Sequence, residues 1–146
     1  MDDEDDIPPD MEPCLSIGQV AELTGLSIHA LRFYEREGLL ATPVHRGPGG
    51  RRSYSEWDVE WLEVCVKLRA SGMPLTAIRQ YADLVSKGSG NEEDRLSLLR
   101  QHQEHVRAQL AELAECMELI TFKIGLYEAC LDQGSADPLF TPPVSR

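Results

Sequence analysis

The chain has 146 residues and a formal net charge of −11, which leaves room for one domain of ordinary size or for a small domain with one long helix. It contains no run of 18 apolar residues to span a bilayer, and acids follow Met1 where a secretory leader would be basic and then apolar, so we expect a cytoplasmic protein with no membrane partner. The cysteines form no CxxC pair, which excludes zinc-finger spacing and favours free thiols at Cys14, Cys65, Cys116 and Cys130.

The negative charge is unevenly distributed along the chain. Residues 1–13 contain seven acidic side chains, and three prolines follow Ile7 in the same stretch. This composition predicts a disordered acidic tail over residues 1–14. Residues 27–54 hold five arginines against two glutamates. Because arginine and lysine neutralise phosphates when a protein binds nucleic acid, this positive segment keeps DNA binding possible despite the net charge.

Two short helices are predicted directly after the acidic tail. Ser16 is a suitable N-cap for a helix that ends at Gly25, and Ser27 is a suitable N-cap for a second helix that ends at Gly38. Two helices separated by so few residues have the layout of a helix-turn-helix, whose second helix lies in the major groove of DNA.

Helical periodicity stops between Leu39 and Tyr54, where two prolines and three glycines interrupt the sequence. This composition predicts a short hairpin, or wing, that carries arginines.

Two further helices are predicted after the wing. Ser55 and Asp58 have the spacing of a capping box, and the helix that they begin ends before Gly72. Pro74 is placed for the first turn of the next helix, which ends at a glycine-rich linker over residues 87–90. We therefore expect a DNA-binding domain over residues 15–86.

The last third of the chain has a sustained heptad pattern. Apolar side chains repeat every seven residues on two adjacent seams over residues 91–131, which predicts a coiled-coil helix that needs a partner, most simply a second copy of the chain. The pattern fits parallel and antiparallel pairing equally, and the alternative is a helix that folds back on its own domain. Residues 132–146 are expected to form a flexible tail. The predicted dimerisation residues are Leu99, Val106, Leu110, Leu113, Met117, Ile120, Ile124 and Tyr127.

Several motifs together resemble the signature of the MerR family of transcription regulators. They are Ser16–Ala21 (SIGQVA), Thr24–Ser27 (TGLS), Leu31–Glu35 (LRFYE), Gly38–Leu40 (GLL), Arg52–Ser55 (RSYS) and Leu68–Leu75 (LRASGMPL), and the resemblance covers about residues 15–130.

The resemblance implies a mainly α fold, with a winged helix-turn-helix domain followed by a long coiled-coil dimerisation helix. It also implies a homodimer that joins antiparallel helices and binds a pseudo-palindromic promoter site in double-stranded DNA. In that family the dimer distorts a spacer that is too long for RNA polymerase, so specificity depends partly on DNA shape.

The resemblance also assigns residues to DNA contacts. Arg32 and Tyr34 stand where the family's recognition helix touches DNA, and Phe33 takes a place often held by a second tyrosine. Ser27 and His29 stand at the start of that helix, where His29 is a candidate either for base recognition or for a phosphate contact. For Tyr34 and Tyr54 the alternative is core packing with an exposed hydroxyl. The predicted set is Ser27, His29, Arg32, Phe33, Tyr34, Arg36, Arg51, Arg52 and Tyr54.

The sequence gives less information about the signal that such a regulator would sense than about its fold. Within the family the chain is most similar to the group that responds to aldehydes and to thiol stress, whose members use a thiolate in the third helix. Cys65 lies in that helix, two residues before the matching place, and is either an effector-sensing thiolate or a buried structural cysteine. No cofactor or metal is predicted.

The sequence bears on three other possible functions. A metal-responsive regulator needs a pair of thiolates after the coiled coil, and the tail after Cys130 has no second cysteine. A coiled-coil adaptor that does not bind DNA would fit the low net basicity. An enzyme is not expected, because no phosphate-binding glycine motif or paired catalytic carboxylates are evident.

Overall fold

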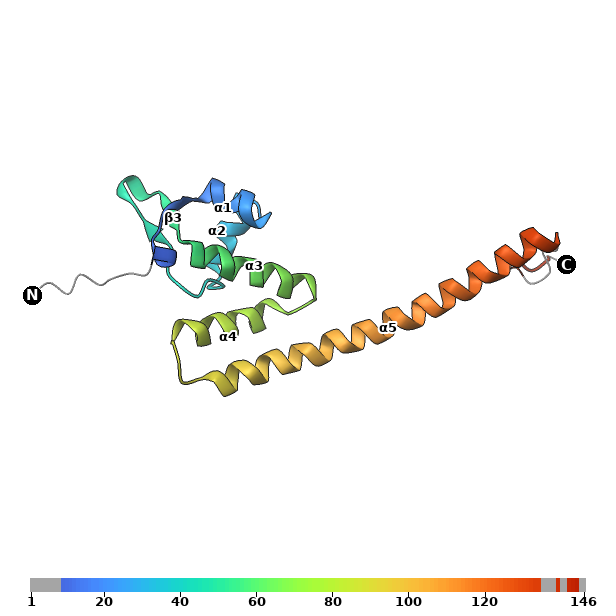
Figure 1. Ribbon diagram of the computed structural model, residues 1–146. Coiled ribbons are helices and arrows are strands. Elements are labelled where there is room, and N and C mark those ends of the chain that lie inside the picture. The colour runs from blue at the N-terminus through green and yellow to red at the C-terminus, as the bar shows by residue number, and fades with distance from the viewer. Residues whose placement is uncertain (1–8, 135–138, 140–141, 145–146) are drawn as a thin grey trace, which may run out of the picture. The chain divides into compact units, whose positions relative to one another are not determined.

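The computed structural model describes residues 9–134, 139 and 142–144, and its contacts divide the chain into two compact units, Met1–His102 and Gln103–Arg146. The fold is mainly helical, as predicted (Figure 1). The α-helices are α1 (Ile17–Thr24), α2 (Ile28–Arg36), α3 (Glu56–Ala70), α4 (Leu75–Ser86) and α5 (Glu92–Gln133), and the strands are β1 (Leu15–Ser16), β2 (His45–Arg46) and β3 (Arg52–Tyr54).

The predicted helix-turn-helix is confirmed at its N-caps. The Ser16 hydroxyl accepts a hydrogen bond from the backbone N–H of Gln19 at 3.2 Å, and the Gln19 side chain accepts one from the N–H of Ser16 at 2.8 Å. Ser27 accepts in the same way from the N–H of Ala30 at 3.0 Å. Helix α1 ends at Gly25, whose φ of 76° is a left-handed conformation that glycine adopts without strain.

The third and fourth helices also begin close to their predicted positions. Ser55 and Asp58 form the expected capping box, with distances of 2.9 and 3.1 Å between the side chains and the reciprocal backbone N–H groups. Pro74 is the N-cap of α4 and does not lie in its first turn, because its ψ of 148° is extended. The helix therefore begins one residue later than predicted.

The wing is a hairpin of β2 and β3, as predicted, in which His45 pairs with Ser53 and Arg46 pairs with Arg52. A single 3-10 turn, η2 (Pro48–Gly50), joins the two strands. The short strand β1 pairs with the other side of β3, so the antiparallel sheet has the order β1-β3-β2. A two-residue strand is too short to produce a periodic signal in the sequence.

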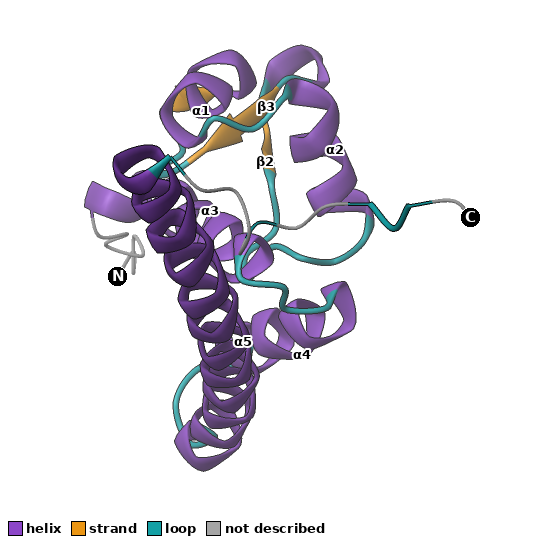
Figure 2. Ribbon diagram, turned by 90° about the vertical axis from the view of Figure 1, so that its right-hand side faces the viewer, coloured by secondary structure: helices purple, strands orange, loops and turns teal. Residues whose placement is uncertain are grey.

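One apolar core joins the helices of the first unit. Fully buried side chains come from α1, α2, the turn after α2, α3 and α4, namely Val20, Leu31, Leu39, Leu62 and Ile78. Figure 2 shows α1, α2 and the strands at one end of this unit, and α3 and α4 extending away from them. The core therefore fixes the recognition helix and the wing on one scaffold.

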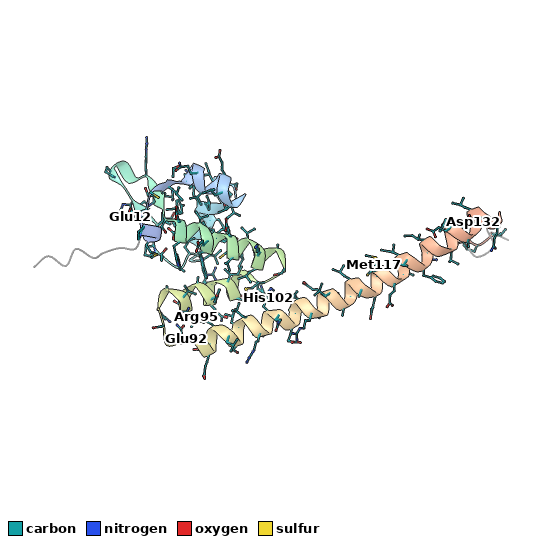
Figure 3. All side chains as sticks on the ribbon, in the orientation of Figure 1. Glu12, Glu92, Arg95, His102, Met117 and Asp132 are labelled. Atoms are coloured by element: carbon teal, nitrogen blue, oxygen red, sulfur yellow. The ribbon has the colours of Figure 1, made fainter. Side chains whose placement is uncertain are left out.

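The start of α5 is anchored to the first unit by hydrogen bonds around the α4–α5 linker. The Arg95 guanidinium donates to the carbonyl of Gly88 at 2.5 Å and to the Asn91 side chain at 2.7 Å, and Asn91 donates to the carbonyl of Leu84 at 2.8 Å. Figure 3 shows Arg95 next to Glu92 at this end of the helix. Farther along α5, the ring of His102 lies 2.7 Å from the Ser71 hydroxyl.

Both tails differ in part from the prediction of disorder. Pro9–Met11 form one 3-10 turn that lies next to α3, and Met11 in this turn is half-buried. Helix α5 continues through Asp132 and Gln133 before Gly134 ends it with a φ of 70°. The rest of the predicted N-terminal tail, residues 1–8, lies outside the described residues, as do residues 135–138, 140–141 and 145–146 of the C-terminal tail.

The second unit exposes the predicted seams. No residue of the 42-residue helix α5 is buried, and the seam residues Leu113 and Met117 are 64% and 61% exposed. A mainly apolar depression on α5 is lined partly by Ile120, Ile124 and Tyr127 of the same seams. In the single chain, these apolar side chains therefore remain in contact with water.

Candidate nucleic-acid interface

Helix α2 has one buried and one exposed face. Leu31 and Tyr34 are buried in the core, whereas His29, Arg32 and Arg36 are exposed. The exposed residues are spaced three and four apart, which places them on one side of the helix, opposite the buried pair. The exposed side of α2 is therefore polar and carries two arginines.

Phe33 lies at the edge between these two faces. Its ring is half-buried and meets Tyr34 edge to face, with ring centroids 6.4 Å apart. The Arg36 guanidinium lies 5.7 Å from the centroid of the Phe33 ring, within the range of a cation–π contact. Phe33 thus provides a surface on which Arg36 rests, although it has no hydroxyl to donate to a phosphate.

The wing is tied to α2 by a carboxylate. One oxygen of Glu35 accepts a hydrogen bond from Arg46 at 2.9 Å, and the other accepts one from Arg52 at 2.5 Å. Arg51 lies between these two arginines in the sequence and is exposed. The cations of the wing and of α2 therefore belong to one connected surface.

The pKa of Glu35 reflects its two arginine partners. Partial burial raises the pKa of this carboxyl, but the hydrogen bonds and charges of Arg52 and Arg46 outweigh burial and lower it below its ordinary value. Glu35 is therefore ionised at neutral pH, which keeps both ion pairs formed.

The C-terminal end of α2 is held by a residue from α4. Arg79 donates a hydrogen bond to the backbone carbonyl of Glu37 at 2.7 Å, and it also pairs with the Glu37 carboxylate at 3.4 Å. A cation at the end of a helix is also favoured by the helix dipole. This contact fixes the recognition helix against the rest of the first unit.

Comparison with known proteins assigns the family. Residues 15–84 match the family described as "MerR HTH family regulatory protein", and residues 59–121 match "MerR, DNA binding". An uncharacterised HTH-type transcriptional regulator of Haemophilus influenzae is 33% identical over 86% of this chain and 93% of its own length. The chain belongs to the MerR family.

Two further comparisons describe related MerR proteins. The transcriptional regulator AdhR of Bacillus subtilis is 38% identical over 58% of this chain and 60% of its own length. The crystal structure of HiNmlR, a MerR family regulator that lacks the sensor domain and is bound to promoter DNA, superposes with a TM-score of 0.73 at 33% identity, over 85% of this chain and 98% of that one. The MerR fold predicted from the sequence is thus confirmed.

For this MerR chain, the two tyrosines predicted to contact DNA lie in the core. Tyr34 is 6% exposed and Tyr54 is 0% exposed, and the Tyr54 hydroxyl has no hydrogen-bond partner among the described residues. Tyr54 has no exposed surface and cannot reach a phosphate in this conformation, and Tyr34 exposes very little. Both tyrosines thus pack in the core, but the Tyr54 hydroxyl is buried and not exposed as the alternative expects, and the contacts proposed below exclude both residues.

Cys65 is likewise a core residue. Its side chain is fully buried in α3, and burial raises the pKa of its thiol to about 12. A reactive thiolate needs a lowered pKa and access to solvent. In this conformation, burial and the raised pKa both oppose a sensing thiolate at Cys65 and favour the alternative of a buried structural cysteine.

The sequence prediction missed two residues of this surface, Glu35 and Arg46. In the sequence, Glu35 is the last residue of the LRFYE motif and an acid within a basic segment, and Arg46 is one of several wing arginines. Their pairing is a tertiary contact between residues eleven positions apart. The only hint in the sequence is the number of arginines in the wing. It does not identify which of them form ion pairs with Glu35.

Metal clusters and membrane-spanning helices are both absent from the described residues. Within the described part of the chain, no three histidine, cysteine or acidic side chains are grouped closely enough to hold a metal ion. Among the same residues, no helix combines the length and the apolar character needed to cross a bilayer.

Proposed function

We propose that two copies of this chain pair through α5 and bind a pseudo-palindromic promoter site as a MerR-type transcription regulator. The observation that carries the proposal is the exposed apolar seam of α5, which occurs in the same chain as a winged helix-turn-helix with an arginine-bearing face. A single helix cannot bury such a seam, so a partner helix must cover it.

Antiparallel pairing, which the family resemblance implies, places the two DNA-binding domains at opposite ends of the coiled coil. The seam from Leu99 to Tyr127 is about 42 Å long at 1.5 Å per residue. Half-sites one turn of DNA apart are separated by about 34–36 Å. The length of the coil is therefore suited to holding two domains on separate half-sites of one duplex.

On each half-site, we assign base recognition to the start of α2 and backbone contacts to the arginines. Ser27 and His29 stand at the N-terminal end of the exposed face, where a recognition helix approaches base edges. Arg32, Arg36, Arg51 and Arg52 are assigned to phosphates, and Phe33 supports Arg36.

Once bound, the dimer bends and untwists the promoter spacer so that RNA polymerase can engage both promoter elements. This step comes from the family resemblance, and its physical basis is that contact energy is used to deform the duplex. The resemblance to the family group that responds to aldehydes and thiol stress, together with the similarity to AdhR, supports a response to reactive carbonyl or thiol stress, and the burial of Cys65 favours a sensing chemistry that does not use it.

The proposal is tested by substituting one seam residue. Leu113→Asp places a charge inside the paired seam. The full-length variant is expected to sediment as a monomer where the wild type sediments as a dimer, and to lose promoter binding in a gel shift. Ala111→Asp introduces the same charge on another side of α5 and is expected to leave both unchanged, because Ala111 lies outside the seams. A wild-type monomer at micromolar concentration would contradict the dimer, and a dimer that binds no duplex would favour an adaptor.

A further inference from the structure

The contact between Glu35 and the wing has a defined geometry on both sides. Arg46 donates to Glu35 from one terminal nitrogen and to the carbonyl of Gly50 from the other, at 3.2 Å, so its guanidinium is held by α2 and by the wing turn together. Arg52 donates to Glu35 from Nε. Each carboxylate oxygen of Glu35 thus accepts a hydrogen bond from one arginine.

Arg52 retains most of its hydrogen-bonding capacity. A guanidinium has five N–H donors, and Nε provides only one of them. The other four make no hydrogen bond to any of the described residues, and the side chain is 22% exposed. Arg52 can therefore remain bound to Glu35 while it donates to a second anion.

The charge of Glu35 is unfavourable for binding phosphate by itself. It lies in the most basic segment of the chain, and an acid at such a surface repels DNA. Its side chain is only 24% exposed and pairs with two cations, which is an arrangement that orders the wing. Glu35 therefore lowers the net positive charge of this surface, but it holds the wing in a fixed position against α2.

We infer that Glu35 is a positioning residue for DNA recognition, which fixes the wing arginines Arg46 and Arg52 relative to the recognition helix so that both elements meet one phosphate backbone together. This inference rests on the proposed DNA-binding function. A wing that is already ordered loses less conformational freedom on binding, and it engages a site only in one register. Glu35 thereby increases selectivity, although its charge opposes binding to duplex DNA in general.

The test compares Glu35→Gln and Glu35→Asp with the wild-type full-length chain. Glutamine removes the charge, and aspartate keeps the charge but withdraws the carboxylate by one methylene. Glu60→Gln is the matched control, since Glu60 is an exposed acid of α3 in the same unit. Anisotropy titrations measure the affinity for a duplex with the inverted repeat selected by the wild-type chain and for a random duplex of equal length.

Both Glu35 variants are expected to lose about tenfold in the ratio of the two affinities, which is the scale of one charged contact. Glu60→Gln is expected to keep the wild-type ratio. The inference is overturned if Glu35→Asp keeps the wild-type ratio, or if Glu35→Gln strengthens binding to both duplexes equally, because Glu35 would then act only by its charge.

A measurement without DNA separates this inference from the proposed function. Amide hydrogen exchange of β2 and β3 in the free protein is expected to become faster in both Glu35 variants and to stay unchanged in Glu60→Gln. If the wild-type chain shows no preference for any repeat, the proposed function fails, and exchange still tests the role of Glu35. Unchanged exchange in both Glu35 variants would overturn the inference directly.

Discussion

The indole N–H of Trp61 donates a hydrogen bond to the backbone carbonyl of Leu39 at 2.9 Å, and both residues are buried. Trp61 belongs to α3 and Leu39 to the turn that follows the recognition helix. The Trp61 ring also stacks on Trp57 and contacts Tyr81 of α4, with centroids 6.2 and 5.3 Å apart. Trp61 therefore joins the end of the recognition helix to the two helices that support it.

Trp61→Phe is expected to lower the free energy of unfolding by about 2–3 kcal/mol, because the buried Leu39 carbonyl loses its partner and the smaller ring leaves a void. Urea denaturation at a fixed chain concentration measures this change. Trp57→Phe is the control, since Trp57 is only half-buried and its expected loss is smaller. Equal losses in the two variants would show that the hydrogen bond to Leu39 contributes nothing measurable.

Phe33→Tyr is expected to strengthen DNA binding about two- to tenfold, because it adds one hydroxyl that can donate to a phosphate at a half-buried position beside Arg36. The gain should be the same for the selected repeat and for a random duplex, since phosphate contacts carry no base information. Anisotropy titration against both duplexes measures it. A gain confined to the selected repeat would instead place residue 33 near a base edge.

Cys65 is expected not to react with a thiol reagent in the folded protein at neutral pH, and to react once the chain is unfolded in urea, because its pKa is raised to about 12 by burial. Cys14 is exposed and serves as the internal control. In a promoter assay, Cys65→Ser should keep the response to formaldehyde, methylglyoxal or diamide. Loss of that response without loss of promoter binding would restore Cys65 as a sensor.

The same pKa predicts how stability depends on alkaline pH. The neutral thiol is favoured in the folded state, so its contribution to the free energy of unfolding is complete below the ordinary thiol pKa of 9.0 and is lost as the pH rises from there through about 12. Urea denaturation of the wild type and of Cys65→Ala across this range measures the difference. A difference between them that does not change with pH would contradict the burial of Cys65.

The pairing of Glu35 predicts a dependence on acidic pH. Its folded-state pKa is lowered from 4.5, so the stabilisation by Arg46 and Arg52 is complete above that value and is lost as the pH falls through the lower folded pKa. The NMR shifts of the two arginine Nε–H groups should therefore stay constant above pH 5 and change only below pH 4.5. They should not titrate in Glu35→Gln. A transition in the wild type above pH 5 would contradict the lowered pKa.

Local chemistry made much of the fold predictable. Ser16, Ser27 and the pair Ser55 and Asp58 signal their helices through caps that involve only the next three residues, and the heptads of α5 repeat often enough to be unambiguous. These features depend on near neighbours in the sequence, which is why they could be predicted.

The places of Tyr54, Cys65 and Glu35 depend on tertiary contacts. Tyr54 lies in a three-residue strand, where alternation is too brief to show which side chains point inward. Cys65 lies in a helix whose apolar residues are spread around its circumference, so its burial could not be read from spacing. The partnership of Glu35 with Arg52 spans seventeen positions and exists only after the wing folds back on α2.

Selection of bound sequences from a library of random duplexes, using the full-length chain at physiological salt, tests the central claim most directly. The account predicts that the recovered sequences share an inverted repeat of constant spacing, and that the mass of the complex corresponds to two chains on each duplex. Recovery of a single half-site bound by one chain, or of no common sequence, would contradict it.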